Sequence, residues 1–559
     1  MIAPGLTSIV RKIHSASPRF WGLLALSLLA LPILAAIWGL SWFVVQDGPL
    51  HLYNAHVLAE SLKPSSAFHQ FYAVRWLPLP YWGAYVLSAA LMSVLPERAA
   101  DQIIITLCSV GFVACLAWLR RQISGWEGMA MAAPLVVLLG LNVLWLLGLY
   151  GFLLGACLYL VTLGVWWKNR GRLGLKQALV LAALLVAGYF CHVVSMAFTV
   201  IGLGILAVMT PGDGWRRRVG WTAFSVSPLV PLVLVYRSLV LKAGAVVAQW
   251  EQLTSAVSFR EWLHYVRVPD LLLLHDPQAM IAGGGIRATL FHAPVPSNWA
   301  GAGLILFLLA PLISRQARDR AFIRTHRGWI ILTVALLACG FFGPSKFGEA
   351  HGGLIRERLL LAGFATLVPI LRINSKQVLA WAGTVLLFIA TALQVGLLWD
   401  YALMSSRDVA AFMEAKPYVG TGKRVAALMV NPNGRFKASP MPHIGNMLGI
   451  HTSNMVWNNY APALYYFPLR FQSDEAREIA DQIGDDVQYY DFLNPEKAGE
   501  ALEDWESLLD ESESQIDVLI VWHSTPEVDE INSRWFEDDP VFENEQVKVL
   551  IHSPEENPP

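Results

Sequence analysis

Long apolar stretches separated by short, basic loops dominate the first 400 residues of the chain. Eleven of them are long enough, or nearly long enough, to cross a bilayer, which takes about 20 residues. They cover residues 21–45, 103–119, 129–147, 149–167, 178–191, 193–210, 221–240, 299–313, 329–342, 359–371 and 379–399. A twelfth candidate, 77–95, begins with Leu-Pro-Leu-Pro, which suits an interfacial or re-entrant segment better than a spanning helix. The pattern predicts an α-helical polytopic membrane protein with about 11 transmembrane helices in residues 1–400.

The distribution of basic residues orients these spans. Arg11, Lys12 and Arg19 precede the first span, and the loops on their side carry 19 basic residues against 10 on the other side. Because basic loops stay in the cytoplasm, we expect a cytoplasmic N-terminus and a multi-pass protein of the cytoplasmic (inner) membrane. The first span lacks a small-residue cleavage site and is interpreted as a retained signal-anchor. Three larger loops then lie outside, at residues 46–102, 241–298 and 343–358.

Residues 401–559 differ in character from the membrane body. They hold 28 acidic and 11 basic residues and no cysteine, so this part is a water-soluble, acidic region without disulfides. Its apolar pattern predicts strands at 425–430, 516–522 and 547–552 and helices at 407–415, 474–482, 496–511 and 526–537. That succession predicts a small extracytoplasmic α/β domain docked over the outer loops.

The sequence offers little support for a cofactor. The five cysteines all lie in or beside apolar stretches, and no Cys or His spacing fits a zinc site. There is no Walker loop, dinucleotide fingerprint or GxSxG motif either. We therefore expect no cofactor, and a divalent metal has no support from ligand spacing. We expect the protein to contact membrane lipids and not to bind nucleic acid.

Asp47 and His51 follow the first apolar stretch in the sequence Gln46-Asp47-Gly48-Pro49-Leu50-His51. Ionisable groups at a membrane edge are costly and mark candidate functional sites. Asp before Gly-Pro also suits a helix cap, and the two roles are compatible. On a helix, residues 47 and 51 share a face, so His51 could orient a catalytic Asp47 or contact a phosphate.

These features resemble the GT-C superfamily of membrane glycosyltransferases. The resemblance lies in a cytoplasmic N-terminus, an Asp-containing first outer loop and the Leu-Pro-Leu-Pro-Tyr-Trp stretch at 77–82. It implies a polyprenyl-phosphate-linked sugar donor used on the outer face, with Asp47 as the catalytic base, and it fits a soluble C-terminal domain. Many members carry two adjacent acids where this chain has Gln46-Asp47, so a metal or two-carboxylate mechanism is not expected.

Further candidates are basic. Arg356 and Arg358 stand at the outer mouth of the tenth span, where two guanidinium groups could clamp a lipid phosphate or simply anchor the helix at the interface. Lys346 is a weaker candidate for the same role. His192 interrupts a long apolar region at an outer turn, where it is either a hydrogen-bonded packing residue or part of the site.

Other polar residues have an ordinary structural interpretation. Glu60, Glu97 and Asp101 are interpreted as solvated or interfacial charges of the first loop. The loop from His443 to Tyr460 is rich in Gly, Asn and His and could help to bind an acceptor sugar, although a structural role explains most of it.

The predicted function is therefore an inverting hexosyl or pentosyl transferase that uses a polyprenyl-phosphate-linked donor and a glycan, lipid or protein acceptor of the cell envelope. The alternative is a non-catalytic transporter or assembly partner in envelope polysaccharide export. Few charges lie within the spans, which argues against a transporter.

Overall fold

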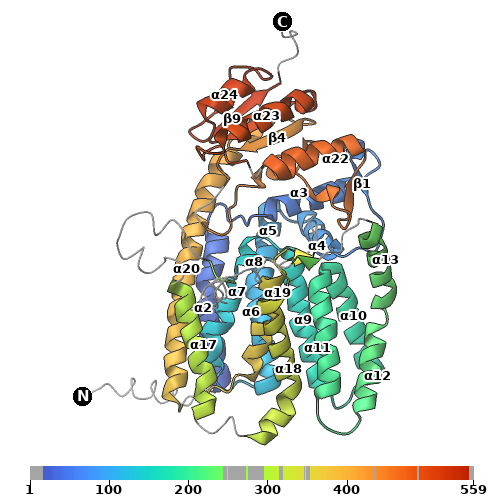
Figure 1. The fold of residues 1–559 in the computed structure, drawn as a ribbon, viewed down its shortest axis with the longest axis vertical. Coiled ribbons are helices and arrows are strands. Elements are labelled where there is room, and N and C mark those ends of the chain that lie inside the picture. The colour runs from blue at the N-terminus through green and yellow to red at the C-terminus, as the bar shows by residue number, and fades with distance from the viewer. Residues whose placement is uncertain are drawn as a thin grey trace, which may run out of the picture.

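The structure is a computed structural model that describes residues 17–242, 248–249, 272–274, 295–313, 319–344, 346–347, 353–374, 376–432, 436–487 and 490–552. Figure 1 shows a bundle of roughly parallel helices with a layer of strands and short helices stacked on one end. We refer to this end of the bundle as the outer end and to the opposite end as the inner end.

Each of the eleven apolar stretches contains a helix. The helices of the bundle are α2 (Pro18–Gly39), α5 (Glu97–Thr106) continuing through a π turn into α6 (Phe112–Ser124), α7 (Met129–Gly140), α9 (Tyr150–Asn169), α10 (Leu175–Cys191), α11 (Val193–Met209), α12 (Trp215–Val226), α13 (Leu229–Lys242), α17 (Val295–Ile313), α18 (Arg320–Phe342), α19 (Ile355–Leu367) and α20 (Val378–Met413). Among the described residues, six helical segments are long and apolar enough to cross a membrane, or seven if the bent pair α12 and α13 is one span. The predicted fold class, a polytopic helical membrane protein with a small C-terminal α/β region, is confirmed.

The segment predicted as interfacial, 77–95, contains only the short helix α4 (Trp82–Met92). Its 11 residues extend about 16 Å, roughly half of the hydrocarbon thickness. Helix α4 packs against α3 (Gly48–Glu60) at the outer end of the bundle (Figure 1). This length and position agree with an interfacial segment.

The first span is shorter than predicted, because α2 ends at Gly39 and not at Val45. Residues 40–47 leave the helix and are fixed by neighbours instead: the Ser405 hydroxyl accepts from the Val44 amide, and Tyr401 donates to the Val44 carbonyl. The backbone amides of Gln46 and Asp47 then donate to the carbonyls of Leu146 and Leu147. The extended segment thus places Asp47 against the turn that precedes α9.

The basic loops predicted to share one side do meet at the inner end. Arg120 donates to the carbonyls of Val368 and Leu371, and Arg372 pairs with Asp319 at 3.2 Å. Arg327, from the start of α18, donates to the carbonyl of Met209 at the end of α11. These contacts join the ends of α6, α11, α18 and α19, which agrees with the predicted grouping of the loops.

The C-terminal region contains a five-stranded sheet in the order β5 (Met455–Val456), β4 (Arg424–Met429), β7 (Val518–Trp522), β9 (Val547–Ile551) and β8 (Phe542–Glu543). β4 pairs in parallel with β5 and β7, and β9 runs antiparallel to β7 and β8. The helices are α22 (Asp474–Asp481), α23 (Ala498–Ser512) and α24 (Pro526–Asn532). The predicted strands and the last three predicted helices are present with small shifts, whereas 407–415 lies mostly within the long helix α20.

The first outer loop belongs physically to this C-terminal region. Its residues Leu50, Tyr53 and Tyr72 share one hydrophobic core with the strands β4 and β7, separate from the core of the bundle. A two-stranded antiparallel pair links β1 (Tyr72–Val74) to β6 (Leu469–Phe471). The amides of Asn54 and Asn459 also exchange hydrogen bonds of 2.8 and 3.1 Å. The loop and the C-terminal region therefore form one packed layer over the outer end.

Candidate active site

A cavity of about 160 Å³ lies where the bundle meets this outer layer. It is far larger than a single water needs. Its wall combines residues from the start of α3, helix α4 and its N-cap, the start of α9, the turn between α10 and α11, helix α19 and the C-terminal segment 460–467. The residues that line it are Asp47, His51, Tyr81, Ala84, Tyr85, Leu149, Tyr150, Gly151, Phe152, His192, Arg358, Tyr460, Leu464, Tyr466 and Phe467. Four predicted site residues, Asp47, His51, His192 and Arg358, therefore meet in one cavity.

The carboxylate of Asp47 is not used as a helix cap. Asp47 occupies the N-cap position of α3, but its side chain makes no capping hydrogen bond. The turn before α9 approaches it closely through Gly148, which has a φ of 81° and leaves no room for a side chain beside the Asp47 amide. Since the cap is unused, the carboxylate remains available to the cavity.

Burial changes the protonation of this carboxylate. It raises the pKa of Asp47 from 3.8 to about 7, because a carboxylate out of water is costly to ionise. The imidazole of His443 lies beside this carboxylate, with its Nε2 3.7 Å from Oδ1 of Asp47. Burial lowers the pKa of His443 to about 4, so this imidazole is neutral at neutral pH. Asp47 is thus poised to exchange a proton near neutral pH.

His51 lies one turn along α3 and faces the same cavity. Its Nδ1 is 3.1 Å from the Tyr85 hydroxyl, and its ring packs against Tyr150. Burial lowers the pKa of His51 to about 4, and a hydrogen bond to the Gly148 backbone opposes that shift. Burial therefore favours the neutral form of the His51 imidazole, and its role toward Asp47 or a phosphate stays a prediction. The structure records the contact of Asp47 with His443 instead.

A second carboxylate is buried near this loop, contrary to the expectation that Asp101 is a solvated charge. Asp101 is 5% exposed and accepts a 2.5 Å hydrogen bond from Tyr150. Helix α5 turns Asp101 toward α9 and away from solvent, which its neighbours in sequence could not reveal. Glu97 and Glu60 are partly exposed, as predicted, and contact His451 and Lys63.

The two arginines of α19, Arg356 and Arg358, point in different directions. Residues two positions apart on a helix point about 160° away from each other. Arg356 lies about 3.5 Å from the carbonyls of Gly340 and Phe341 at the end of α18, whereas Arg358 lines the cavity with its guanidinium over the Phe152 ring. The structure therefore brings Arg358 to Asp47's cavity and does not bring Arg356 there.

Arg358 is a buried cation with no carboxylate partner among the described residues. It is 7% exposed, its Nε has no hydrogen-bond partner, and within the described parts of the chain it forms no ion pair. A buried guanidinium is normally paired, because desolvation of an isolated charge is costly. An anion that enters the cavity would supply the missing partner.

His192 occupies the turn between α10 and α11, where it caps α11. Its Nε2 lies 3.1 Å from the Tyr81 hydroxyl and 3.4 Å from Nη1 of Arg358. His192 thus caps α11 and also lines the cavity, and its part in a reaction stays a prediction.

The other residues and loops predicted from the sequence to contribute to the site lie partly outside the residues that the structure describes. Lys346 belongs to the two-residue strand β3 (Lys346–Phe347), which pairs with β2 (Ala248–Gln249), and its side chain is outside the described part. Most of the 241–298 loop and part of 343–358 are also outside it. Among the residues that are described, no group of three or more His, Cys, Asp or Glu side chains could hold a metal ion.

The C-terminal region supplies site residues that the sequence only hinted at. His443 contacts Asp47, and Tyr460, Tyr466 and Phe467 line the cavity. Two of these four, His443 and Tyr460, bound the Gly/Asn/His-rich loop that stood out in the sequence. No local pattern marked the aromatic run Tyr465-Tyr466-Phe467.

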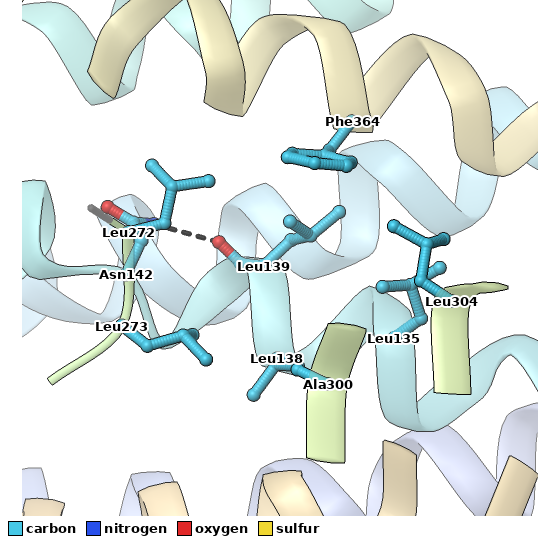
Figure 2. Close-up of a pocket in the computed structure, with 9 residues that line it drawn as sticks. All are labelled: Leu135, Leu138, Leu139, Asn142, Leu272, Leu273, Ala300, Leu304 and Phe364. Carbon is cyan, nitrogen blue, oxygen red and sulfur yellow. Dashed lines mark hydrogen bonds between the residues drawn. The ribbon is translucent and has the colours of Figure 1, made fainter. Parts of the chain in front are cut away.

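A second cavity, within the bundle, lacks ionisable side chains among its described lining residues. Figure 2 shows Phe364 of α19, Leu135, Leu138 and Leu139 of α7, and Ala300 and Leu304 of α17 around it. Its one polar side chain, Asn142, donates to the carbonyl of Leu139. This cavity offers apolar packing and no acid–base chemistry.

Comparisons with known proteins give only distant similarity. No family model matches the chain, and no curated protein matches its sequence. The structure is similar to that of ArnT from Cupriavidus metallidurans in the apo state, with 11% identity and a TM-score of 0.44 over 96% of this chain and 98% of that one. Arabinofuranosyltransferase AftD from Mycobacteria gives 15% identity and a TM-score of 0.46 over 97% of this chain but 40% of that one. The Archaeoglobus fulgidus oligosaccharyltransferase in its apo form gives 10% and 0.41 over 83% of this chain and 69% of that one.

Proposed function

We propose that the protein is a membrane glycosyltransferase that moves a sugar from a polyprenyl-phosphate carrier to an acceptor of the cell envelope. One observation carries the proposal: a single cavity at the outer end brings together the Asp47 carboxylate, whose pKa is raised by burial, and the buried guanidinium of Arg358, which forms no ion pair within the described residues. The support for the proposal comes from Asp47 and Arg358 and not from the distant structural similarities.

The place of the cavity suits a reaction between a lipid and a water-soluble group. Helices of the bundle form one part of its wall, and the C-terminal segment 460–467 forms another. A lipid-linked donor can arrive from the bilayer, and an acceptor can arrive from the aqueous side. The proposed side is the extracytoplasmic face of the inner membrane, with the N-terminus in the cytoplasm.

Arg358 is assigned to the phosphate of the donor. A guanidinium binds two oxygens of a phosphate in parallel, and such charge-assisted hydrogen bonds are strong in a water-poor site. The phosphate gains negative charge when its bond to the sugar breaks. Arg358 would therefore stabilise the transition state more than the bound donor, which is what lowers a barrier.

Asp47 is assigned as the general base. Its ionised carboxylate takes the proton of an acceptor hydroxyl while that oxygen attacks the anomeric carbon of the donor sugar. The bond from the anomeric carbon to the phosphate oxygen breaks, and its electron pair stays on the lipid phosphate beside Arg358. A single displacement of this kind inverts the anomeric carbon. Protonated Asp47 then returns its proton to water.

The test is a transfer assay with the full chain in nanodiscs. A panel of polyprenyl-phosphate-linked hexoses and pentoses is supplied with envelope glycan acceptors, and NMR determines the anomeric configuration of any product. We expect transfer from at least one donor, with inversion. Movement of the lipid-linked sugar across a liposome membrane without product would contradict the proposal and favour a transporter.

The pH dependence of transfer should report the ionisation of Asp47. A base must be ionised to accept a proton, and burial raises the pKa of Asp47 to about 7. We therefore expect kcat/KM to rise about tenfold per pH unit below pH 7 and to level off above it. A rate that is flat between pH 5 and pH 8 would contradict the raised pKa of Asp47, because an ordinary solvated aspartate is already ionised at pH 5.

A further inference from the structure

We propose that Tyr81 is a second phosphate-binding residue and that His192 orients its hydroxyl. This inference rests on the proposed function, since the anion concerned is the phosphate of a lipid-linked donor. Tyr81 is not among the residues predicted from the sequence, because a search for ionisable groups does not select a tyrosine in an apolar environment.

The hydrogen bonds of His192 determine which of its ring nitrogens carries the proton. Its Nδ1 accepts from the backbone amide of Val194 at 3.2 Å, as part of the cap of α11. A neutral imidazole that accepts at Nδ1 must carry its proton on Nε2. Nε2 therefore donates to the Tyr81 hydroxyl oxygen, 3.1 Å away.

This arrangement leaves the Tyr81 proton free. A phenol both donates and accepts, and the hydroxyl oxygen of Tyr81 already accepts from His192. Within the described residues, the Tyr81 hydroxyl has no other hydrogen-bond partner. Its hydroxyl proton can therefore point into the cavity, which Tyr81 lines together with Arg358.

Arg358 lies close to the same nitrogen of His192, and its Nε has no hydrogen-bond partner among the described residues. Its Nη1 is 3.4 Å from Nε2 of His192, but both nitrogens carry protons, so neither accepts from the other. A guanidinium and a phenol around one point match the unesterified oxygens of a sugar phosphodiester. Among the described residues, no hydrogen bond joins Arg358 to the Tyr81 hydroxyl, whereas a phosphate oxygen would accept from both groups.

The backbone of Tyr81 supports a functional role. Its φ is 76°, a left-handed conformation that is rare and strained for a bulky residue. Gly151 leaves room for the Cys191 carbonyl and the Tyr81 ring to pack close to α9, because a side chain at position 151 would collide with that carbonyl and contact the ring. The ring is further held by stacking on Phe467 and by an edge contact with His192. Strain held by this many neighbours is typical of a functional position.

The experiment compares the binding of farnesyl phosphate and of farnesol, which lacks the phosphate, to the full chain in nanodiscs. Tyr81→Phe keeps the ring and removes only the hydroxyl. We expect it to weaken farnesyl phosphate binding roughly 10- to 100-fold, as for a lost hydrogen bond to a charged group, and to leave farnesol binding unchanged. The matched control is Tyr401→Phe, which removes a buried hydroxyl that donates to Val44 outside the cavity; it should leave both affinities unchanged.

Two further arms identify the source of the anion. Inorganic phosphate should compete weakly with farnesyl phosphate, and nanodiscs enriched in phosphatidylglycerol should not compete. Equal competition by phosphatidylglycerol would overturn the assignment to a donor phosphate, and so would equal affinities of wild type and Tyr81→Phe for farnesyl phosphate.

The role of His192 is separated from a structural effect by a double-mutant cycle. Asn is a good capping residue for α11, but its short side chain has no ring nitrogen to reach Tyr81, so His192→Asn should weaken farnesyl phosphate binding less than Tyr81→Phe does. If His192 acts through Tyr81, the double variant Tyr81→Phe/His192→Asn should bind as Tyr81→Phe does. Losses that multiply would overturn the orienting role.

Failure of this inference can be told apart from failure of the proposed function. If wild type transfers sugar and Tyr81→Phe binds farnesyl phosphate normally, only the assignment of Tyr81 falls. If wild type neither transfers sugar nor prefers farnesyl phosphate over farnesol, both the assignment and the glycosyltransferase function fall.

Discussion

Replacing Asp47 with Asn should lower kcat/KM for sugar transfer by about 100-fold or more, the usual contribution of a general base. The amide has nearly the shape of the carboxylate but cannot take a proton from the acceptor. Because Asp47 makes no capping hydrogen bond, the substitution should leave helix α3 intact. The measurement is steady-state transfer with a polyprenyl-phosphate-linked donor, together with the thermal unfolding temperature of each variant.

Glu60→Gln is the matched control for this substitution. Glu60 is an acid of the same helix, but it pairs with the exposed Lys63 and does not line the cavity. It should transfer sugar at the wild-type rate. Wild-type-like transfer by Asp47→Asn, or an equal loss in Glu60→Gln, would remove Asp47 from the chemistry.

Arg358→Gln should lower kcat about 100- to 1,000-fold, the range seen when one group that stabilises transition-state charge is removed. The donor phosphate would then carry its developing charge in a buried site without a cation. A lower kcat, and not only a raised KM, is expected because the interaction strengthens as the sugar–phosphate bond breaks. Initial rates over a range of donor concentrations separate the two constants.

Arg356→Gln distinguishes the geometry of the site from the simpler prediction of a two-arginine clamp. Both substitutions remove one positive charge from the same end of α19, but Arg356 lies against the end of α18 and Arg358 lines the cavity. We expect Arg356→Gln to lower thermal stability and to change kcat little. Equal losses of kcat in both variants would instead support a phosphate site formed by both arginines.

Several residues of the site could be identified from the sequence because they are ionisable groups in apolar surroundings. Asp47, His192 and Arg358 each interrupt or border an apolar stretch, where an unneeded charge is costly. The charge pattern does not show which of two nearby arginines faces the cavity, but the period of the helix shows that both cannot. Arg356 and Arg358 are two residues apart, so one helix cannot direct both into the same cavity.

The other residues of the site depend on tertiary packing. Asp101 lies at the start of a span, a position that is compatible with a solvated charge, and only the approach of Tyr150 from α9 buries it. His443 is far from Asp47 in sequence and reaches it because the C-terminal region packs on the first loop. Neither contact leaves a local signature.

The division of the chain into a membrane body and a tail at residue 400 reflects charge and not packing. Helix α20 runs without interruption from Val378 to Met413, and the first loop shares a hydrophobic core with the C-terminal strands. The C-terminal region is therefore proposed to complete the active site and not only to cover it.

The most direct measurement is a cryo-EM structure of the full chain in nanodiscs with a non-transferable phosphonate analogue of a polyprenyl-phosphate-linked sugar. We expect the phosphonate to contact Arg358 and the Tyr81 hydroxyl and the anomeric carbon to face Asp47. A headgroup bound elsewhere, or one that lies along a path through the bundle toward the inner end, would contradict this assignment of the active site.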